Sequence, residues 1–160
     1  MRRPPPTLHL MVGLPCSGKT TLARQLERDK NALLLSPDPW QIGIFGQDAN
    51  DPLHDERHAF IETMLWQLAK RALQLGTSVI LDYGFWAREE REFFRQQARE
   101  LGARSEIHYL DLPREELLRR LALRNASAPE ESFQIRPESM ENWIDFFQKP
   151  DSDELPPRDL

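Results

Sequence analysis

The sequence predicts an α/β fold in which a parallel sheet lies between two layers of helices. Four short segments are almost continuously apolar, which is the pattern of strands covered on both faces. Amphipathic segments with helix start and stop signals separate them. Because strands that alternate with helices form parallel sheets through right-handed crossovers, we expect a three-layer α/β/α sandwich with four to five parallel strands.

Each expected strand is bounded by Gly, Pro, Ser or Asp, residues that interrupt regular structure. The four strands are expected at residues 8–12, 32–35, 78–81 and 107–110. The segment after Arg136 contains no convincing apolar run, so the sequence leaves open whether a fifth strand exists.

Five helices are expected between and after these strands. They cover residues 18–28, 55–75 and 87–101, a segment starting at Pro113, and a segment from near Pro137 to before Pro150. Gly76 and Gly102 are good C-cap residues for the helices over 55–75 and 87–101. The third helix alternates acids with Arg88, Arg91, Arg95 and Arg99, so we expect most of these arginines on the solvated surface.

Length and composition indicate one domain that works in a reducing compartment. The chain has 160 residues and a single cysteine, so a cytoplasmic location is the simplest expectation. No apolar run approaches the roughly 20 residues of a membrane span. A net charge of -5 argues against nucleic acid as the main partner. We expect a disordered arm over 1–6, the domain over 7–150 and a polar tail over 151–160; the sequence does not indicate the oligomeric state.

The segment from Gly13 to Thr20 matches the pattern G-x-x-x-x-G-K-[ST], known as the P-loop. It follows a strand and opens a helix, as its mechanism requires, because backbone N–H groups and the helix N-terminus then face the phosphates. The motif predicts that the chain binds ATP with Mg²⁺. The expected nucleotide contacts in the loop are Gly13, Pro15, Cys16, Ser17, Gly18, Lys19, Thr20 and Thr21.

The expected magnesium ligands are the Thr20 hydroxyl and Asp82, an acid that closes the third strand. The alternative for Asp82 is an ordinary acid that starts a turn with Gly84. The following residue is Tyr83, whereas motor ATPases commonly place a water-activating Glu there. No Asn-Lys-x-Asp segment for reading guanine is present, so a hydrolytic motor and a GTPase are both disfavoured.

Asp38 ends the second strand, at the edge where open α/β sheets hold ligands. A carboxylate there can take the proton of a hydroxyl that attacks the γ-phosphate. Pro37 and Pro39 would stiffen the segment, and Trp40 would offer an aromatic wall. The alternative is a turn aspartate between two prolines.

Arg120 and Arg124 are four residues apart, so they share one helix face, with Leu117, Leu118 and Leu121 on the buried side. Two guanidinium groups on one face suit a clamp over a triphosphate. The alternative is a solvated face whose arginines pair with acids at 115 and 116.

Residues 7–147 together resemble the small P-loop kinase group that includes zeta toxins, chloramphenicol phosphotransferase and the kinase domain of polynucleotide kinase. The segments that carry the resemblance are residues 13–21, 36–38, 81–82 and 121–125. It implies a P-loop NTPase fold, Asp38 as the base, and Arg120 and Arg124 on a lid over about 114–137. The segment after Asp38 lacks the arginine that polynucleotide kinases carry near it.

The expected function is transfer of the ATP γ-phosphate to a hydroxyl of a small molecule, with Lys19, Asp38, Arg120 and Arg124 as catalytic residues. The acceptor would lie between Asp38, Trp40, Tyr83, Trp86 and the helix after Asp55. His54, Arg57 and His58 are further candidates to line it, and the alternative for each is a surface or core position. Two alternatives stay open: a 5′-hydroxyl kinase of oligonucleotides, and an ATP-binding regulatory module with negligible turnover.

Overall fold

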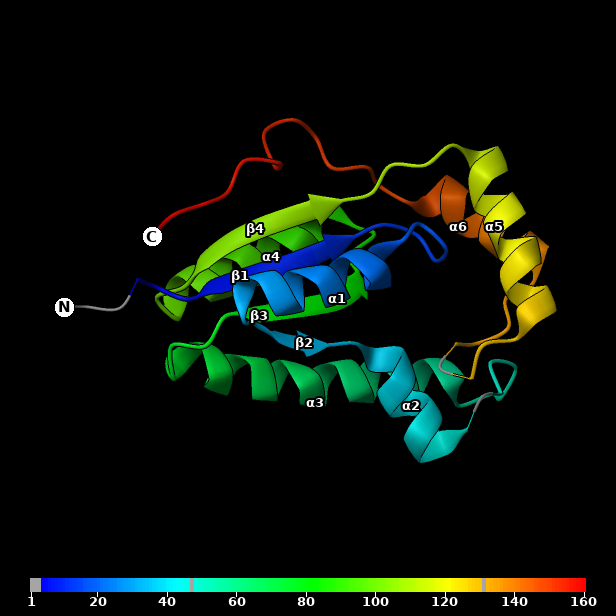
Figure 1. Cartoon of the computed structure of the whole chain (residues 1–160), viewed down its shortest axis with the longest axis horizontal. Helices are drawn as coiled ribbons and strands as arrows, with labels where there is room; N and C mark the ends of the chain where they lie inside the picture. The colour runs from blue at the N-terminus through cyan, green and yellow to red at the C-terminus, as the bar shows by residue number, and fades with distance from the viewer. Residues whose placement is uncertain (1–3, 47, 131) are drawn as a thin grey trace.

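The computed structural model of the protein describes residues 4–46, 48–130 and 132–160, and these form a three-layer α/β/α sandwich (Figure 1). Part of the arm expected over 1–6 therefore lies outside the described residues. The elements in chain order are β1 (Thr7–Val12), α1 (Lys19–Lys30), β2 (Leu33–Leu35), α2 (Pro37–Phe45), α3 (His54–Gln74), β3 (Val79–Gly84), α4 (Arg88–Glu100), β4 (Arg104–Tyr109), α5 (Arg114–Ser127) and α6 (Pro137–Phe146).

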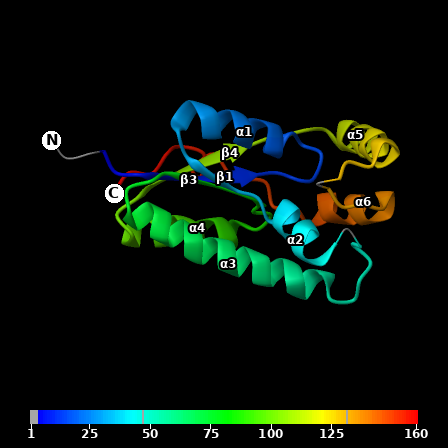
Figure 2. The same cartoon turned by 60° about the horizontal axis from the view of Figure 1, so that its bottom comes forward.

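The described strands form one parallel sheet in the order β2-β3-β1-β4. Helix α1 covers one face of it, and α3 and α4 cover the other (Figure 2). Helices α5 and α6 lie beyond the carboxyl ends of the strands, at one end of the molecule (Figure 1). The predicted fold class is confirmed. No helix in the part of the chain described here is long and apolar enough to cross a membrane.

Alternate residues of β1 supply both halves of the core. Leu8, Leu10 and Val12 are fully buried in the cluster that includes residues of α3 and α4. Met11 packs on the opposite face, in the cluster that contains Ala23 of α1. Burial of a side chain of this size contributes about 1.5–3 kcal/mol, so the central strand is held firmly from both sides.

Helix α2 is the element that the sequence did not predict. Two prolines near Asp38 suggested a turn, yet Pro37 is the first residue of a helix whose N-cap, Ser36, has an extended backbone. Proline is tolerated in the first turn because the N–H groups there have no intrahelical acceptor. Asp38 therefore lies in the first turn of a helix, where a negative charge is favoured.

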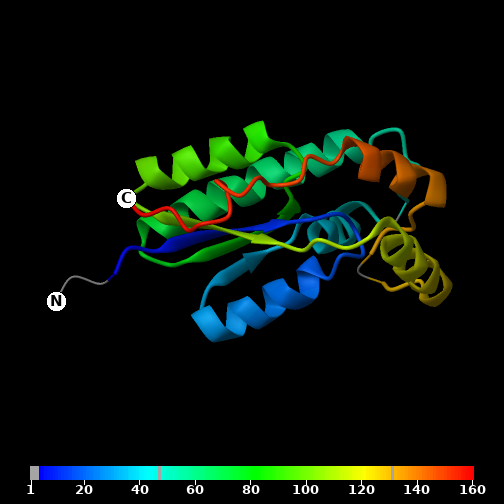
Figure 3. The ribbon, with the colours of Figure 1, turned by 90° about the horizontal axis from the view of Figure 1, so that it is seen from above.

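The chain after α6 returns along β4 and α4 (Figure 3). Ser105 of β4 and Arg158 form an antiparallel bridge, with both N–H···O=C bonds made between the two residues, at 2.8 and 3.0 Å. The tail thus lies against the edge strand where a further strand of the sheet would pair.

Two arginines of α4 anchor this tail, and the prediction that most arginines of this helix are solvated is wrong for them. Arg91 is fully buried, and its Nε donates to Glu154, also fully buried, at 2.8 Å. Arg95 is 3% exposed and donates to the backbone carbonyls of Glu154 and Pro156. The sequence pattern of alternating charges does not reveal that another segment covers this face.

Candidate functional site

The loop between β1 and α1 forms an open cradle whose shape depends on its glycines. A Cβ on Gly13 would lie 2.7 Å from Ser17 Oγ, so a side chain there would close the loop. Gly18 caps α1 with a φ of 95°, a conformation that glycine adopts at little cost. The buried Ser17 Oγ has no hydrogen-bond partner among the described residues. This arrangement fits a loop shaped to surround a phosphate group.

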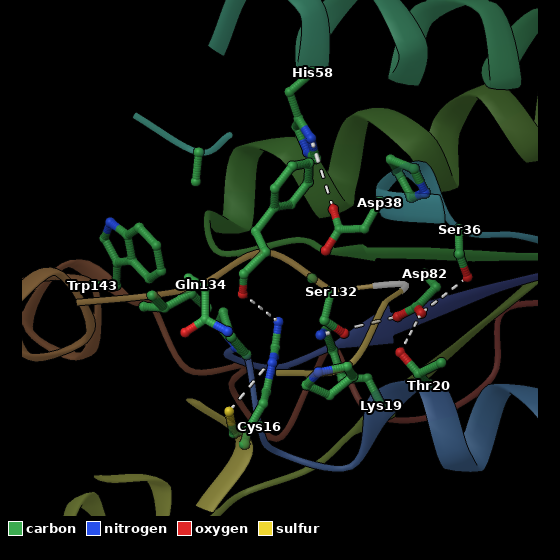
Figure 4. Close-up of a pocket in the computed structure, with 18 of the residues that line it drawn as sticks. Cys16, Lys19, Thr20, Ser36, Asp38, His58, Asp82, Ser132, Gln134 and Trp143 are labelled. Carbon is green, nitrogen blue, oxygen red and sulfur yellow. Dashed lines mark hydrogen bonds and ion pairs between the residues drawn. The ribbon is translucent and has the colours of Figure 1, made fainter. Parts of the chain in front are cut away.

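Thr20, Ser36 and Asp82 meet at the carboxyl ends of β2 and β3. The Thr20 hydroxyl donates to Asp82 Oδ2 at 2.8 Å, and the Ser36 hydroxyl donates to the same oxygen at 3.1 Å (Figure 4). Lys19 Nζ lies 4.0 Å from Asp82 Oδ1, which is buried and accepts no hydrogen bond in the described part of the chain. Hydroxyl and carboxylate oxygens are the ligands that Mg²⁺ prefers, so the residues present fit this ion.

Asp38 opens into the same pocket as Lys19 and Asp82 (Figure 4). Its carboxylate lies 3.9 Å from His58 Nδ1, and 46% of its side chain is exposed because it faces the cavity. The surrounding protein raises the pKa of Asp38 through burial, and the charges of His58, Lys19 and Arg124 oppose part of that rise. A carboxylate with a raised pKa is a stronger proton acceptor when ionised.

His58 belongs to α3 and is held by two partners besides Asp38. Its Nδ1 lies 2.8 Å from Gln41 Oε1, and its Nε2 lies 3.1 Å from Glu62 Oε1. Burial alone would lower the pKa of His58, but the hydrogen bond and charge of Glu62 and the charges of Asp38 and Asp55 outweigh burial and raise it. The imidazole thus places partial positive charge beside Asp38.

The two arginines of α5 both line the pocket, so they share one face of the helix, as their spacing of four residues indicates. Arg124 reaches the P-loop, with its Nη1 at 3.6 Å from Cys16 Sγ, and donates to the Phe133 carbonyl at 3.2 Å. Its buried Nε has no hydrogen-bond partner among the described residues. Arg120 lies close to Gly18 and also pairs with Glu116 at 2.7 Å. Of the three leucines expected on the buried side of this helix, Leu117 and Leu121 are buried and Leu118 is partly buried.

One cavity of about 860 Å³ joins these parts. It is large enough for a nucleotide and a second small molecule, since ligand pockets commonly measure about 300–1,000 Å³. Of the predicted site residues, those that line it are Pro15, Cys16, Gly18, Lys19, Thr20, Thr21, Asp38, Asp82, Arg120 and Arg124. Gly13 and Ser17 lie behind this surface and shape the loop.

The structure corrects two of the expected acceptor contacts. Trp40 is 49% exposed and is not among the residues that line the cavity, because the helix that starts at Pro37 turns it outward. Arg57 pairs with Asp51 and lies over the ring of Phe45 instead. Tyr83 and Trp86 line the cavity, as expected. His54 and His58, for which a surface or core position was the alternative, line it too.

Several lining residues were not proposed from the sequence. They come from the N-cap of α2, from the segment between α5 and α6, and from α6 itself. They include Ser36, Ser132, Gln134, Arg136 and Trp143. The rings of Trp86 and Trp143 lie 5.4 Å apart and form one aromatic wall. Helix amphipathicity alone does not identify such residues, since only the folded chain brings Trp143 of α6 beside Trp86, in the loop after β3.

Three solved structures share this architecture. A chain of the Pnkp1/Rnl/Hen1 RNA repair complex has a TM-score of 0.72 and 26% identity, over 91% of this chain and 45% of that chain. Kti12 from Chaetomium thermophilum, in complex with ADP-AlF3, has a TM-score of 0.66 and 25% identity, over 90% of this chain and 81% of the Kti12 chain. A sugar kinase from Janibacter sp. HTCC2649 has a TM-score of 0.66 and 21% identity, over 95% of this chain and 83% of the sugar kinase chain.

The chain therefore spans less than half of the matched RNA-repair chain and most of the other two. No match was found among curated proteins. The family model described as an AAA domain matches residues 8–150, the region that contains the P-loop, the sheet and the pocket. On this evidence the chain belongs to that AAA-domain family and has its P-loop kinase-like fold.

Proposed function

We propose that the protein is an ATP-dependent phosphotransferase whose acceptor is a hydroxyl group of a small molecule. The observation that carries the proposal is the position of Asp38, whose carboxylate opens into the cavity that also contains Lys19, Thr20 and Asp82. A base and a phosphate site that share one cavity are what transfer to a hydroxyl requires.

The roles follow from the position of each group. The P-loop and Lys19 hold the β- and γ-phosphates, and Thr20 and Asp82 hold Mg²⁺, with Ser36 orienting the Asp82 carboxylate. When bound, ATP supplies the γ-phosphoryl group. Asp38 takes the proton from the acceptor hydroxyl. The oxygen of that hydroxyl bonds to the γ-phosphorus, and the bond between the γ-phosphorus and the bridging oxygen breaks, which releases ADP. Arg120 and Arg124 stabilise the charge that develops during transfer.

The surroundings of Asp38 favour a small acceptor. The cations that act on this carboxylate are His58, Lys19 and Arg124, and the last two belong to the phosphate side of the cavity. The wall offers aromatic rings and uncharged hydrogen-bonding groups in Trp86, Trp143, Ser132 and Gln134. Such a wall suits a polyol, sugar or amino alcohol better than a chain of phosphates.

A 5′-hydroxyl kinase of oligonucleotides remains the second candidate, and the observation that favours it is the 26% identity to a chain of an RNA repair complex. The side of the cavity that leads to Asp38 would then have to accept a phosphate backbone. Arg136, which also lines the cavity, offers a guanidinium group for that contact.

The test is a transfer assay with ATP labelled at the γ-phosphate. The purified protein is incubated with Mg²⁺ and either a pool of small metabolites or 5′-hydroxyl oligonucleotides, beside Lys19→Ala as the control for the phosphate loop. Label in a small molecule, absent with Lys19→Ala, supports the proposal. Label at oligonucleotide 5′ ends would replace it with the second candidate. Tight ATP binding by calorimetry without transfer to either pool would identify a regulatory module.

A further inference from the structure

A second cluster of ligating side chains lies away from the pocket, on the face of the sheet that α1 covers. His9 of β1 pairs in register with Glu106 of β4, and Met11 pairs with His108. Met11 packs against α1, and side chains two residues apart on a strand point to the same face, so His9, Glu106 and His108 share that face. We propose that these three side chains form a binding site for Zn²⁺ or a similar divalent transition metal.

The distances between the ligating atoms match such a site. His9 Nδ1 lies 3.0 Å from His108 Nε2 and 3.7 Å from Glu106 Oε2, and His108 Nε2 lies 4.0 Å from Glu106 Oε1. Two ligands about 2.0–2.1 Å from a tetrahedral Zn²⁺ are roughly 3.3 Å apart. With one oxygen taken from Glu106, the three ligand atoms all lie within 4.8 Å of one another. A rotation of the side chains would bring them to one ion, with a fourth position for water.

The protonation state of the cluster also suits a metal. Burial and the neighbouring His108 lower the pKa of His9 to about 4, and burial lowers the pKa of His108. Burial thus favours the neutral form of both rings, and neutral imidazole is a preferred ligand of Zn²⁺. In the metal-free protein one of the two facing nitrogens carries a proton; binding requires only that this proton move to the other nitrogen of its own ring.

A small cavity borders two of the three proposed ligands. His9 and Glu106 line a cavity of about 210 Å³. Thr7 and Arg104, the first residues of β1 and β4, and Ser78, which precedes β3, line it as well. Lys30, at the end of α1, lines the same cavity, and its charge helps to lower the pKa of both histidines. The same positive charge repels a bound cation, so we expect Lys30 to weaken the affinity of the site for Zn²⁺.

The test is a titration of chelator-treated protein with Zn²⁺ in competition with a chromophoric chelator. Every sample carries Cys16→Ser and Asp82→Asn, because the thiol and the expected magnesium site could bind the ion as well. We expect one equivalent to bind and the melting temperature to rise with Zn²⁺. Glu106→Gln should weaken binding at least 10- to 100-fold, the range seen for loss of a supporting group alone, and Lys30→Gln should tighten it.

A second titration uses Co²⁺ as a spectroscopic probe, and a histidine outside the cluster serves as the control. Co²⁺ bound by two imidazoles and a carboxylate in tetrahedral geometry should give visible absorption that His108→Ala abolishes. His54→Asn, a histidine of the large cavity, should change neither titration. Binding that is absent, or that survives both Glu106→Gln and His108→Ala in folded protein, would overturn the proposal and leave His9 and His108 as a buried hydrogen-bonded pair.

Discussion

The carboxylate of Asp38 and the imidazole of His58 lie 3.9 Å apart at the wall of the large cavity. Their charges are coupled, because His58 lowers the pKa of Asp38 while Asp38 helps to raise that of His58. His58 is fixed on its other side by Glu62 and Gln41. If Asp38 is the base, the charge of His58 helps to determine the pH at which that base becomes available.

This coupling predicts a change in the pH dependence of transfer. A base works in its ionised form, so kcat/KM falls as the pH drops through the pKa of Asp38. His58→Asn removes a positive neighbour, the pKa of Asp38 rises further, and activity is lost at a higher pH than in the wild type. The measurement is the acid limb of the kcat/KM profile.

The control for this prediction is His54→Asn. His54 lines the same cavity, and it is not among the charges that act on Asp38. An acid limb that stays in place in His58→Asn, or that moves equally in both variants, would contradict the coupling.

The residues of the P-loop were predictable because the motif is contiguous and each position has a local reason. Gly13 and Gly18 meet backbone requirements, and Lys19 and Thr20 follow at fixed spacing. Ser36 was not predicted as a partner of Asp82, since the two are 46 positions apart and meet only through the pairing of β2 with β3. Contacts of this kind depend on the order of strands in the sheet, which no local pattern specifies.

Among the elements, the strands and the longer helices were predicted well, and α2 was not. Helix α2 has nine residues, begins with Pro-Asp-Pro and has no strong polar face, so its pattern resembles a turn followed by a loop. The C-terminal tail was also understood only in part. Its polarity was evident, but the burial of Glu154 against Arg91 required knowledge of the packing on α4.

This buried pair gives a stability prediction. Glu154→Gln leaves the Arg91 guanidinium buried without a counter-charge, and loss of one partner of a buried pair costs about 3–5 kcal/mol. We expect that loss in the free energy of unfolding measured by denaturant titration. Glu92→Gln, which loosens the more exposed pair with Arg158, should cost much less.

The same pair makes stability depend on pH. Burial would raise the pKa of Glu154, but the hydrogen bonds from Arg91 and the backbone of Asp151 hold it below its ordinary value of 4.5. The contribution is therefore present above about pH 4.5 and is lost as the pH falls through the lower folded-state value. A variant as stable as the wild type at pH 7 would show that the pair does not hold the tail.

Helix α5 carries a prediction about catalysis rather than folding. Arg124 touches the P-loop through Cys16, so Arg124→Ala should slow transfer by about 10³-fold, as for other arginines that stabilise phosphoryl transfer, with little change in melting temperature. Arg119→Ala is the matched control, because Arg119 lies on the same helix, is 61% exposed and pairs with Glu116. An Arg124→Ala protein that melts early but keeps full turnover would make this arginine structural.

At the scale of the whole molecule, the parallel sheet explains why the site forms where it does. The carboxyl ends of β1, β2 and β3 carry the P-loop, the segment of Ser36 and Asp38, and Asp82. Helices α5 and α6 close the same end of the molecule (Figure 1). Residues from distant parts of the chain thus share one cavity, with the phosphate site on one side and Asp38 on the other.

The central claim is that Asp38 serves as a base and Asp82 serves the metal. The most direct measurement compares Asp38→Asn with Asp82→Asn, recording ATP affinity by calorimetry and transfer of the labelled γ-phosphate as Mg²⁺ is varied. For Asp38→Asn we predict near wild-type ATP affinity and transfer reduced by about 10²-fold or more. For Asp82→Asn we predict a higher Mg²⁺ requirement. Full transfer by Asp38→Asn, with ATP still bound, would contradict the account.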